Sequence, residues 1–362
     1  MTVFFRYYLY RLKKSLILFA VLSGALLVCE LANGVDLIDS FIQIPVIFRD
    51  NRILSANNAI REILKFYFFA AAALSFILPV AVLSPFKKSR ARDPFYALPL
   101  GARKKAAAHL LAGLTVYTAL FVVFAPYHLL RDAGEIGKTG AAGGLLFAVF
   151  LEYLCGVGLY FINSFFFSFA STPFDGAVGI VLWHAVPYAL GGFIRSLFFL
   201  FPDVTDGLVS FFGNRAEPKQ FRFFYPLTQI YRNSAYSLSG IDRVLLPAPA
   251  DPLFYGLFIG FSLAAAILFF ILLPAYKTEN NGSVSSSFMS YKTLIPLNGL
   301  LFVGGFRYGF RIPVTLILML AGYVIYRRGF RLRAPDILWL CCAVALSAVL
   351  VFVLSQHPLK TL

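Results

Sequence analysis

Charged residues are scarce in this chain of 362 residues: they make up 14% of it, whereas hydrophobic residues make up 59%. Soluble domains hold roughly a quarter charged and half apolar residues. A soluble fold of this length could not cover so much apolar surface, so we expect lipid to be the surrounding medium. Several apolar runs also reach the roughly 20 residues that a helix needs to cross a bilayer. The composition predicts an all-α polytopic membrane protein.

Cysteine and histidine are also few, with four of each. The cysteines sit inside apolar runs and have neither the spacing of a metal site nor that of a disulfide framework. The histidines are scattered, and none has a metal-type partner at helical spacing. These residues are Cys29, Cys155, Cys341, Cys342, His109, His128, His184 and His357. We therefore expect no metal, no catalytic residues and no enzymatic activity in this chain.

A nucleotide-binding loop is missing as well. Gly137-Lys138-Thr139 resembles the end of a phosphate-binding loop, but that motif has a glycine five positions before Gly137, where this chain has Asp132. No buried strand precedes the segment, and a glycine-rich turn explains it. We expect this chain to bind no cofactor.

The net charge of +15 could indicate a nucleic-acid partner. The basic residues, however, cluster beside apolar runs, as Lys and Arg do in cytoplasmic loops of membrane proteins. We therefore predict contact with membrane lipids and not with nucleic acid. The basic lead-in at residues 1–14 places the N-terminus in the cytoplasm.

Six apolar runs predict a six-span transmembrane core over residues 1–275, with a cytoplasmic loop at 84–111 and an outer loop at 202–250. Residues 276–362 are expected to form a cytoplasmic loop followed by two or three additional C-terminal spans. No internal repeat is evident. The expected spans are 15–32, 63–83, 106–127, 145–169, 177–201 and 253–273, and the later ones are 293–306, 312–326 and 335–354.

Polar groups inside these spans are candidates for a substrate path, because ionisable residues are costly in a membrane. Glu152 and Asn163 lie in the fourth predicted span and His184 in the fifth. A proton relay through Glu152 is one reading, and an ordinary hydrogen bond between helices is the other. The relay would suit a stand-alone secondary transporter or lipid flippase. Such carriers often have duplicated halves and broken helices, and neither is evident in this sequence.

The loop at 84–111 carries seven basic residues, one acidic residue and a short aromatic segment between two prolines. Asp93 can cap a helix, and Pro94 suits its first position. Phe95, Tyr96 and Leu98 then form about one apolar turn, which Pro99 ends. This turn either fills a groove of a partner protein or dips into the lipid headgroups; the local chemistry leaves both open.

Two segments resemble the permease subunits of bacterial type-2 ABC exporters. Residues 92–99 (RDPFYALP), with Arg103 beyond, are similar to the loop between the second and third spans of that family. Lys277, Glu279 and Gly282 resemble a basic-Glu-x-x-Gly stretch after the sixth span. The basic run at 327–333 before the last predicted span is also similar.

The resemblance implies a permease subunit of an ATP-driven exporter in a bacterial plasma membrane. The helix at Asp93–Leu98 would be a coupling helix seated in a separate ABC ATPase subunit. ATP and Mg would bind to that partner, and a second permease chain, identical or related, would complete the substrate path. A membrane sensor or scaffold is a further alternative without a feature in its favour. The sequence does not indicate the substrate.

Overall fold

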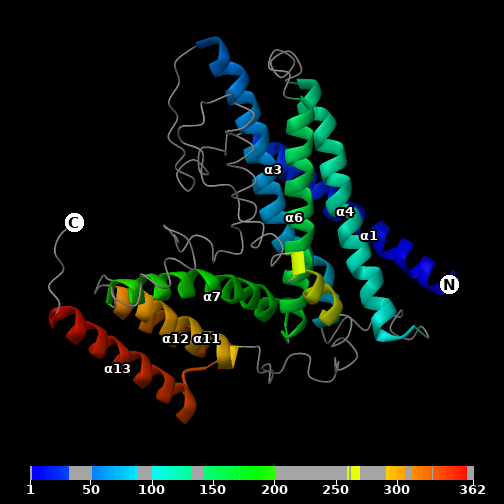
Figure 1. Ribbon diagram of the computed structural model, residues 1–362. Helices are drawn as coiled ribbons and strands as arrows, with labels where there is room; N and C mark the ends of the chain where they lie inside the picture. Colours follow the sequence, from blue (N-terminus) through cyan, green and yellow to red (C-terminus); the bar gives the residue numbers. More distant parts are fainter. Residues whose placement is uncertain are drawn as a thin grey trace. The chain divides into compact units, whose positions relative to one another are not determined.

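The computed structural model describes residues 2–31, 51–87, 100–131, 142–170, 172–200, 259–260, 262–269, 291–305, 311–327 and 329–356. Within these residues the chain is almost entirely helical (Figure 1). The elements are α1 (Thr2–Leu31), α3 (Asn51–Leu83), the 3-10 helix η1 (Ser84–Lys87), α4 (Ala102–Arg131), α6 (Ala142–Ser168), α7 (Pro173–Leu200), α11 (Tyr291–Gly305), α12 (Arg311–Arg327) and α13 (Ala334–Gln356). Helices satisfy their backbone hydrogen bonds internally, as a segment surrounded by lipid must.

Three of these helices are long and apolar enough to cross a membrane: Glu62–Leu83 in α3, Arg103–His128 in α4 and Ala142–Ser168. They match the second, third and fourth predicted spans. Ile312–Tyr326 and Ala334–Val349 are shorter apolar helices near two of the later predictions. The all-helical class is confirmed, and the three apolar helices support an association with a membrane. The count of six core spans stays a prediction.

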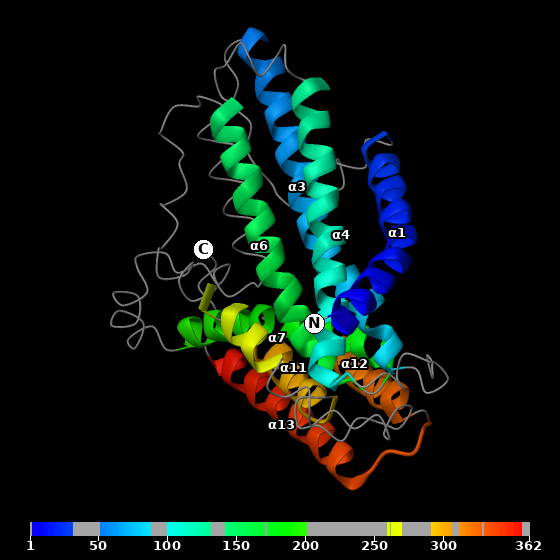
Figure 2. The ribbon, with the colours of Figure 1, turned by 90° about the vertical axis from the view of Figure 1, so that its right-hand side faces the viewer.

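The chain divides into two compact units, and unit 1 comprises Met1–Phe165 and Pro226–Thr278. In unit 1, α4 packs against α1 and α3 (Figures 1 and 2). Helix α6 joins them through side chains: the Tyr160 hydroxyl donates to the Leu110 carbonyl of α4, and the Tyr153 hydroxyl lies 2.9 Å from Thr118 Oγ1. The domain boundary predicted at residue 275 falls outside the described residues.

Unit 2 comprises Phe166–Tyr225 and Glu279–Leu362. Its helix α11 packs against α7, α12 and α13. The starts of two helices follow from local sequence. Thr172 accepts a hydrogen bond from the Asp175 backbone N–H at 3.1 Å, which caps α7 ahead of Pro173, and the Asp336 carboxylate accepts the Arg333 N–H at 2.9 Å at the start of α13.

Candidate functional site

The first half of helix α6 buries one face in unit 1, and from residue 158 to residue 167 nearly every position is buried. The buried positions recur three and four residues apart, which is the period of a helix face. Glu152 is one of them, so the fold places a carboxyl among apolar and aromatic side chains. The buried positions on the face that includes Glu152 are Leu145, Ala148, Val149, Glu152, Cys155, Gly156, Leu159, Tyr160 and Asn163.

Glu152 is completely buried, and neither oxygen of its carboxyl has a hydrogen-bond partner among the described residues. A polar group removed from water without a partner is costly. Within the described part of unit 1, this carboxyl is the strongest candidate for a proton or substrate contact inside the membrane-spanning helices.

The neighbourhood of Glu152 depends on Gly156, one helical turn further along the same face. A Cβ atom at Gly156 would lie 1.9 Å from the hydroxyl oxygen of Tyr117 on α4. Glycine therefore lets the Tyr117 ring enter between the helices, where its hydroxyl donates to the Tyr153 carbonyl at 3.4 Å. The ring is fully buried, and it fills the space between α4 and α6 one helical turn from Glu152.

Asn163 shares the face with Glu152 but not a site with it. The two residues are 11 positions apart, which is about three turns or 16 Å along a helix. The Asn163 side-chain amide donates to the Ser75 carbonyl of α3 at 2.9 Å. Asn163 thus makes a hydrogen bond between helices, which is the structural alternative considered for it.

His184 lies in α7, which belongs to unit 2, and its side chain is half-buried. Its grouping with Glu152 and Asn163 stays a prediction. The predicted substrate path is therefore represented in unit 1 by Glu152 alone.

A second feature of unit 1 lies where α3 and α4 approach the loop between them. His109 of α4 donates from Nδ1 to the Val82 carbonyl of α3 at 2.9 Å, and its Nε2 lies 3.0 Å from the Tyr7 hydroxyl of α1. Arg11 donates from two nitrogens to the same Tyr7 oxygen, at 3.2 Å each. The Tyr7 hydroxyl hydrogen is then left to donate to His109.

This Tyr7–His109–Val82 network joins three helices at one end of the bundle, and His109 is buried there. Sequence reasoning missed it, because Tyr7 and His109 are 102 residues apart and neither belongs to a motif. The sequence offered one signal for this network: His109 lies just inside the predicted span at 106–127. The network fixes the helix ends on both sides of the loop at 84–111.

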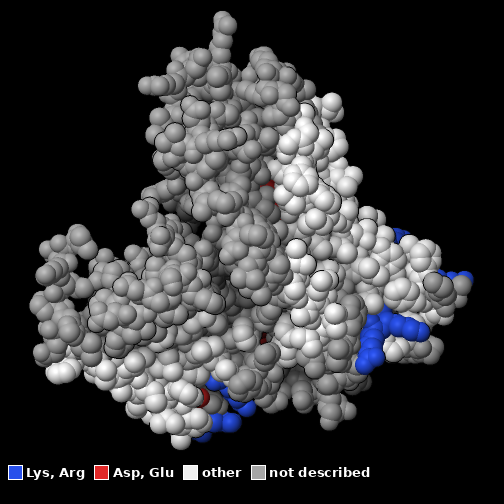
Figure 3. Space-filling view, in the orientation of Figure 1, with Lys and Arg blue, Asp and Glu red and all other residues white. Residues whose placement is uncertain are grey.

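Basic side chains surround this end of unit 1. Figure 3 shows Lys and Arg side chains gathered where α1 and α4 begin. The exposed basic residues at the starts of these two helices are Arg6, Lys13, Lys14, Arg103 and Lys104. Such a cluster fits the predicted contact with anionic lipid headgroups.

Of the predicted coupling residues, the structure describes only Arg103, which is exposed in the first turn of α4. The other predicted coupling residues lie outside the described residues, and so do the three residues singled out in the loop after the sixth predicted span. These are Asp93, Pro94, Phe95, Tyr96, Leu98, Pro99, Lys277, Glu279 and Gly282.

In the part of the chain that is described, no group of three or more His, Cys, Asp or Glu residues could hold a metal ion. Comparisons with protein families, with curated proteins and with solved structures find no match to this chain.

Proposed function

We propose that this chain is the transmembrane permease subunit of an ATP-driven ABC exporter in a bacterial plasma membrane. Its six-span core and its N-terminus in the cytoplasm are part of the proposal. A separate ABC ATPase subunit binds ATP and Mg, and a second permease chain completes the substrate path. The proposal rests on the resemblance of residues 92–99 to the coupling loop of that family.

The structural observation that supports the proposal is the Tyr7–His109–Val82 network at the ends of α3 and α4. A loop that merely connects two spans does not require hydrogen bonds that join the helix ends on both sides of it. Here the helix ends on both sides of the loop are hydrogen-bonded to each other and to α1. A force applied to the loop therefore reaches three helices together.

In this mechanism the ATPase binds the aromatic turn at Phe95 and Tyr96, and the basic flanks hold the loop at the headgroups. Closure of two ATPase subunits on ATP moves the loop. The Tyr7–His109–Val82 network passes the movement to α1, α3 and α4, and the contact of Tyr117 with Gly156 passes it to α6.

Copurification tests the docking step. The double variant Phe95→Ala/Tyr96→Ala should lose an ATPase that copurifies with the wild-type protein from its native membrane. Phe330→Ala is a matched control, because Phe330 is 89% exposed and is also an aromatic residue among basic neighbours. An ATPase retained by the double variant would refute the docking assignment.

His109→Phe tests transmission separately from docking. The variant should keep the bound ATPase but lose part of the ATP-dependent change in helix packing. That change can be followed as labelling of the buried Cys155 by a membrane-permeant maleimide, with and without ATP and vanadate. An undiminished ATP effect in His109→Phe would exclude the network as the link.

A stand-alone carrier or lipid flippase is the second candidate, and the burial of Glu152 without a partner among the described residues favours it. Purified protein in vesicles, without ATP or a partner, would then support proton flux driven by a potassium diffusion potential. A pH-sensitive dye measures that flux, and Glu152→Gln should abolish it. No flux above that of empty vesicles would remove this candidate.

A further inference from the structure

The α12–α13 turn, residues 329–333, carries the most exposed large apolar side chain of the described residues. Phe330 is 89% exposed, and Arg331 and Arg333 close to it are exposed as well. Figure 3 shows a second group of Lys and Arg side chains beside the start of α13. Residues 327–336 contain four arginines and one aspartate. An aromatic ring and an excess of positive charge therefore share one short segment.

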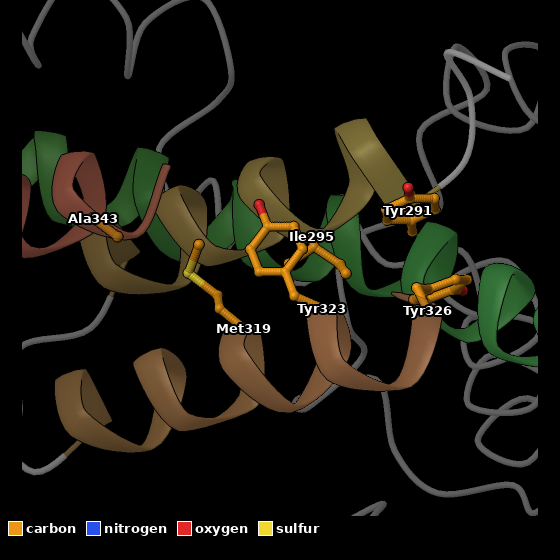
Figure 4. Close-up of a cluster of buried hydrophobic side chains, with 6 residues drawn as sticks. All are labelled: Tyr291, Ile295, Met319, Tyr323, Tyr326 and Ala343. Atoms are coloured by element: carbon orange, nitrogen blue, oxygen red, sulfur yellow. The ribbon is translucent and has the colours of Figure 1, made fainter. Parts of the chain in front are cut away.

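The end of α12 directs the chain into this turn. The Gly329 N–H donates to the Val324 carbonyl at 3.2 Å, a bond to the carbonyl five residues earlier that is typical of a helix C-terminus. Tyr326, in the last turn of α12, stacks on Tyr291 of α11 with ring centroids 4.9 Å apart and an interplanar angle of 14° (Figure 4). The chain therefore leaves α12 in a fixed direction.

The start of α13 fixes the other side of the turn. The Arg333 carbonyl accepts the Asp336 N–H at 2.9 Å, and the Arg333 N–H donates to the Asp336 carboxylate at 2.9 Å. Asp336 is 5% exposed, so its carboxylate faces the backbone of the turn and not its surface. Leu332 packs against the buried cluster of unit 2 that includes Tyr323. Leucine is thus the inward residue of the turn, and Phe330 is held outward.

The helices on both sides of the turn expose apolar side chains. Ile325 of α12 is 50% exposed, and Leu338 of α13 is 61% exposed. The basic, aromatic turn therefore adjoins an apolar surface that continues along both helices. Aromatic and basic side chains are enriched where hydrocarbon gives way to headgroups, and anionic lipids attract Lys and Arg there. An acidic soluble partner would match the arginines but would leave the adjoining apolar surface in water.

We propose that the α12–α13 turn is an anchor for anionic phospholipids, in which Phe330 inserts among the headgroups while Arg331 and Arg333 bind lipid phosphates. Guanidinium groups suit phosphate because their N–H groups can bind two of its oxygens at once. The hydrogen bonds of the turn hold its backbone in place before lipid binds, which lowers the cost of ordering it. The anchor depends neither on the ATPase partner nor on Glu152.

Tryptophan fluorescence tests the anchor on the full-length protein in nanodiscs. Phe330→Trp introduces an indole at the turn, and Trp183→Phe with Trp339→Phe removes the two native tryptophans. The discs contain phosphatidylcholine, either alone or mixed with phosphatidylglycerol. Lipid brominated near the top of its acyl chains quenches an inserted indole, whereas acrylamide quenches one in water. We expect strong quenching by brominated lipid and protection from acrylamide in the mixed discs, and much less of both in phosphatidylcholine alone.

The variant Arg331→Gln/Arg333→Gln, added to this reporter, should remove the dependence on phosphatidylglycerol. Each basic residue near an anionic surface changes the equilibrium roughly fivefold, so the pair should shift the indole roughly 30-fold toward water. Salt at about 1 M should act in the same direction, because it screens charges beyond about 3 Å. Arg331→Lys/Arg333→Lys is the matched control, since it keeps the charge and should keep most of the dependence.

Leu338→Trp in the same background is the reference, because Leu338 is exposed on α13 beyond the arginines. Its indole should be quenched by brominated lipid equally in both kinds of disc. Equal quenching by acrylamide in both discs for Phe330→Trp would overturn the anchor and indicate a soluble partner for the turn. Equal quenching by brominated lipid in both discs would overturn the requirement for anionic lipid.

Discussion

The two units are built from similar helices but are held together differently. In unit 1, tyrosine, histidine and asparagine side chains bind backbone carbonyls of neighbouring helices, as Tyr160 does with Leu110 and Asn163 with Ser75. In unit 2, a cluster that includes Ile295, Met319 and Tyr323 fills the space between α11 and α12. Directional bonds fix one arrangement, whereas flexible apolar side chains accept several. We therefore expect unit 1 to hold one arrangement of its helices and unit 2 to tolerate changes of side chain more readily.

The largest difference between the units should appear when a glycine at a helix contact becomes alanine. In unit 1, a Cβ at Gly113 would lie 2.4 Å from the Tyr160 hydroxyl, and that hydroxyl is held by its bond to Leu110. Gly113→Ala should therefore lower the free energy of unfolding by about 1–3 kcal/mol. The readout is the midpoint at which denaturant exposes Cys155 to a maleimide, with the other three cysteines replaced by serine.

Gly24→Ala is the matched control, because a Cβ at Gly24 of α1 would meet nothing within 4 Å. Removing a glycine from a helix interior there should stabilise the helix by about 0.5–1 kcal/mol. If Gly113→Ala were as harmless as Gly24→Ala, the view of unit 1 as rigidly packed would fail.

An asparagine in each unit allows the next comparison. Asn163→Leu removes the bond to the Ser75 carbonyl in a fully buried place and should cost about 1 kcal/mol of stability. Asn298→Leu removes a comparable bond to Leu182, but it also removes a buried oxygen without a partner among the described residues. Asn298 also lines a hollow of about 690 Å³ between α7, α11 and α12, which has room for leucine. Its effect on stability should be close to zero.

Both asparagine variants can be measured as shifts of the denaturation midpoint. Cys155 reports on unit 1, and a cysteine introduced at the completely buried Ala343 reports on unit 2 in a background without other cysteines. A larger loss for Asn298→Leu than for Asn163→Leu would contradict the contrast between the units.

Gly299→Ala should have a smaller effect than Gly113→Ala, although its Cβ would lie only 2.1 Å from Met319 Sδ. Methionine has three rotatable bonds and can move aside, so we expect a loss below about 1 kcal/mol. The Ala343→Cys reporter measures it. A loss above that of Gly113→Ala would show that unit 2 is the less adaptable unit.

The smallest effect is expected from a test without any substitution, which compares how accessible the native thiols of the two units are to a reagent. Cys155 is buried in unit 1, whereas Cys341 and Cys342 of α13 are exposed. A hydrophobic maleimide should label both α13 cysteines in the folded protein and leave Cys155 unlabelled until denaturant is added. Peptide mapping by mass spectrometry distinguishes them, and early labelling of Cys155 would contradict its burial.

The helical class and the positions of three spans could be predicted because they depend on short stretches of sequence. Apolar runs of sufficient length predict helices wherever they occur, and α3, α4 and α6 lie where the second, third and fourth spans were expected. The two short runs at 293–306 and 312–326 also form helices, α11 and α12, which pack against each other. Glu152 was identified by the same local logic, as a carboxyl inside an apolar run.

Contacts between helices could not be predicted in this way. Glu152 and Asn163 look alike in sequence, as polar residues in one apolar span. The structure gives Asn163 a carbonyl to bind on α3 and gives Glu152 no hydrogen-bond partner among the described residues. The difference depends on which neighbouring backbone each side chain meets.

The sequence by itself determined that this chain is helical and that it has runs long and apolar enough to cross a membrane, since hydropathy and run length act locally. The tertiary structure alone decided that His109 joins α1, α3 and α4, that Glu152 lacks a hydrogen-bond partner among the described residues, and that α7, α11 and α12 enclose a hollow. Each of these depends on how helices from distant parts of the chain are rotated and packed. No single helix carries that information.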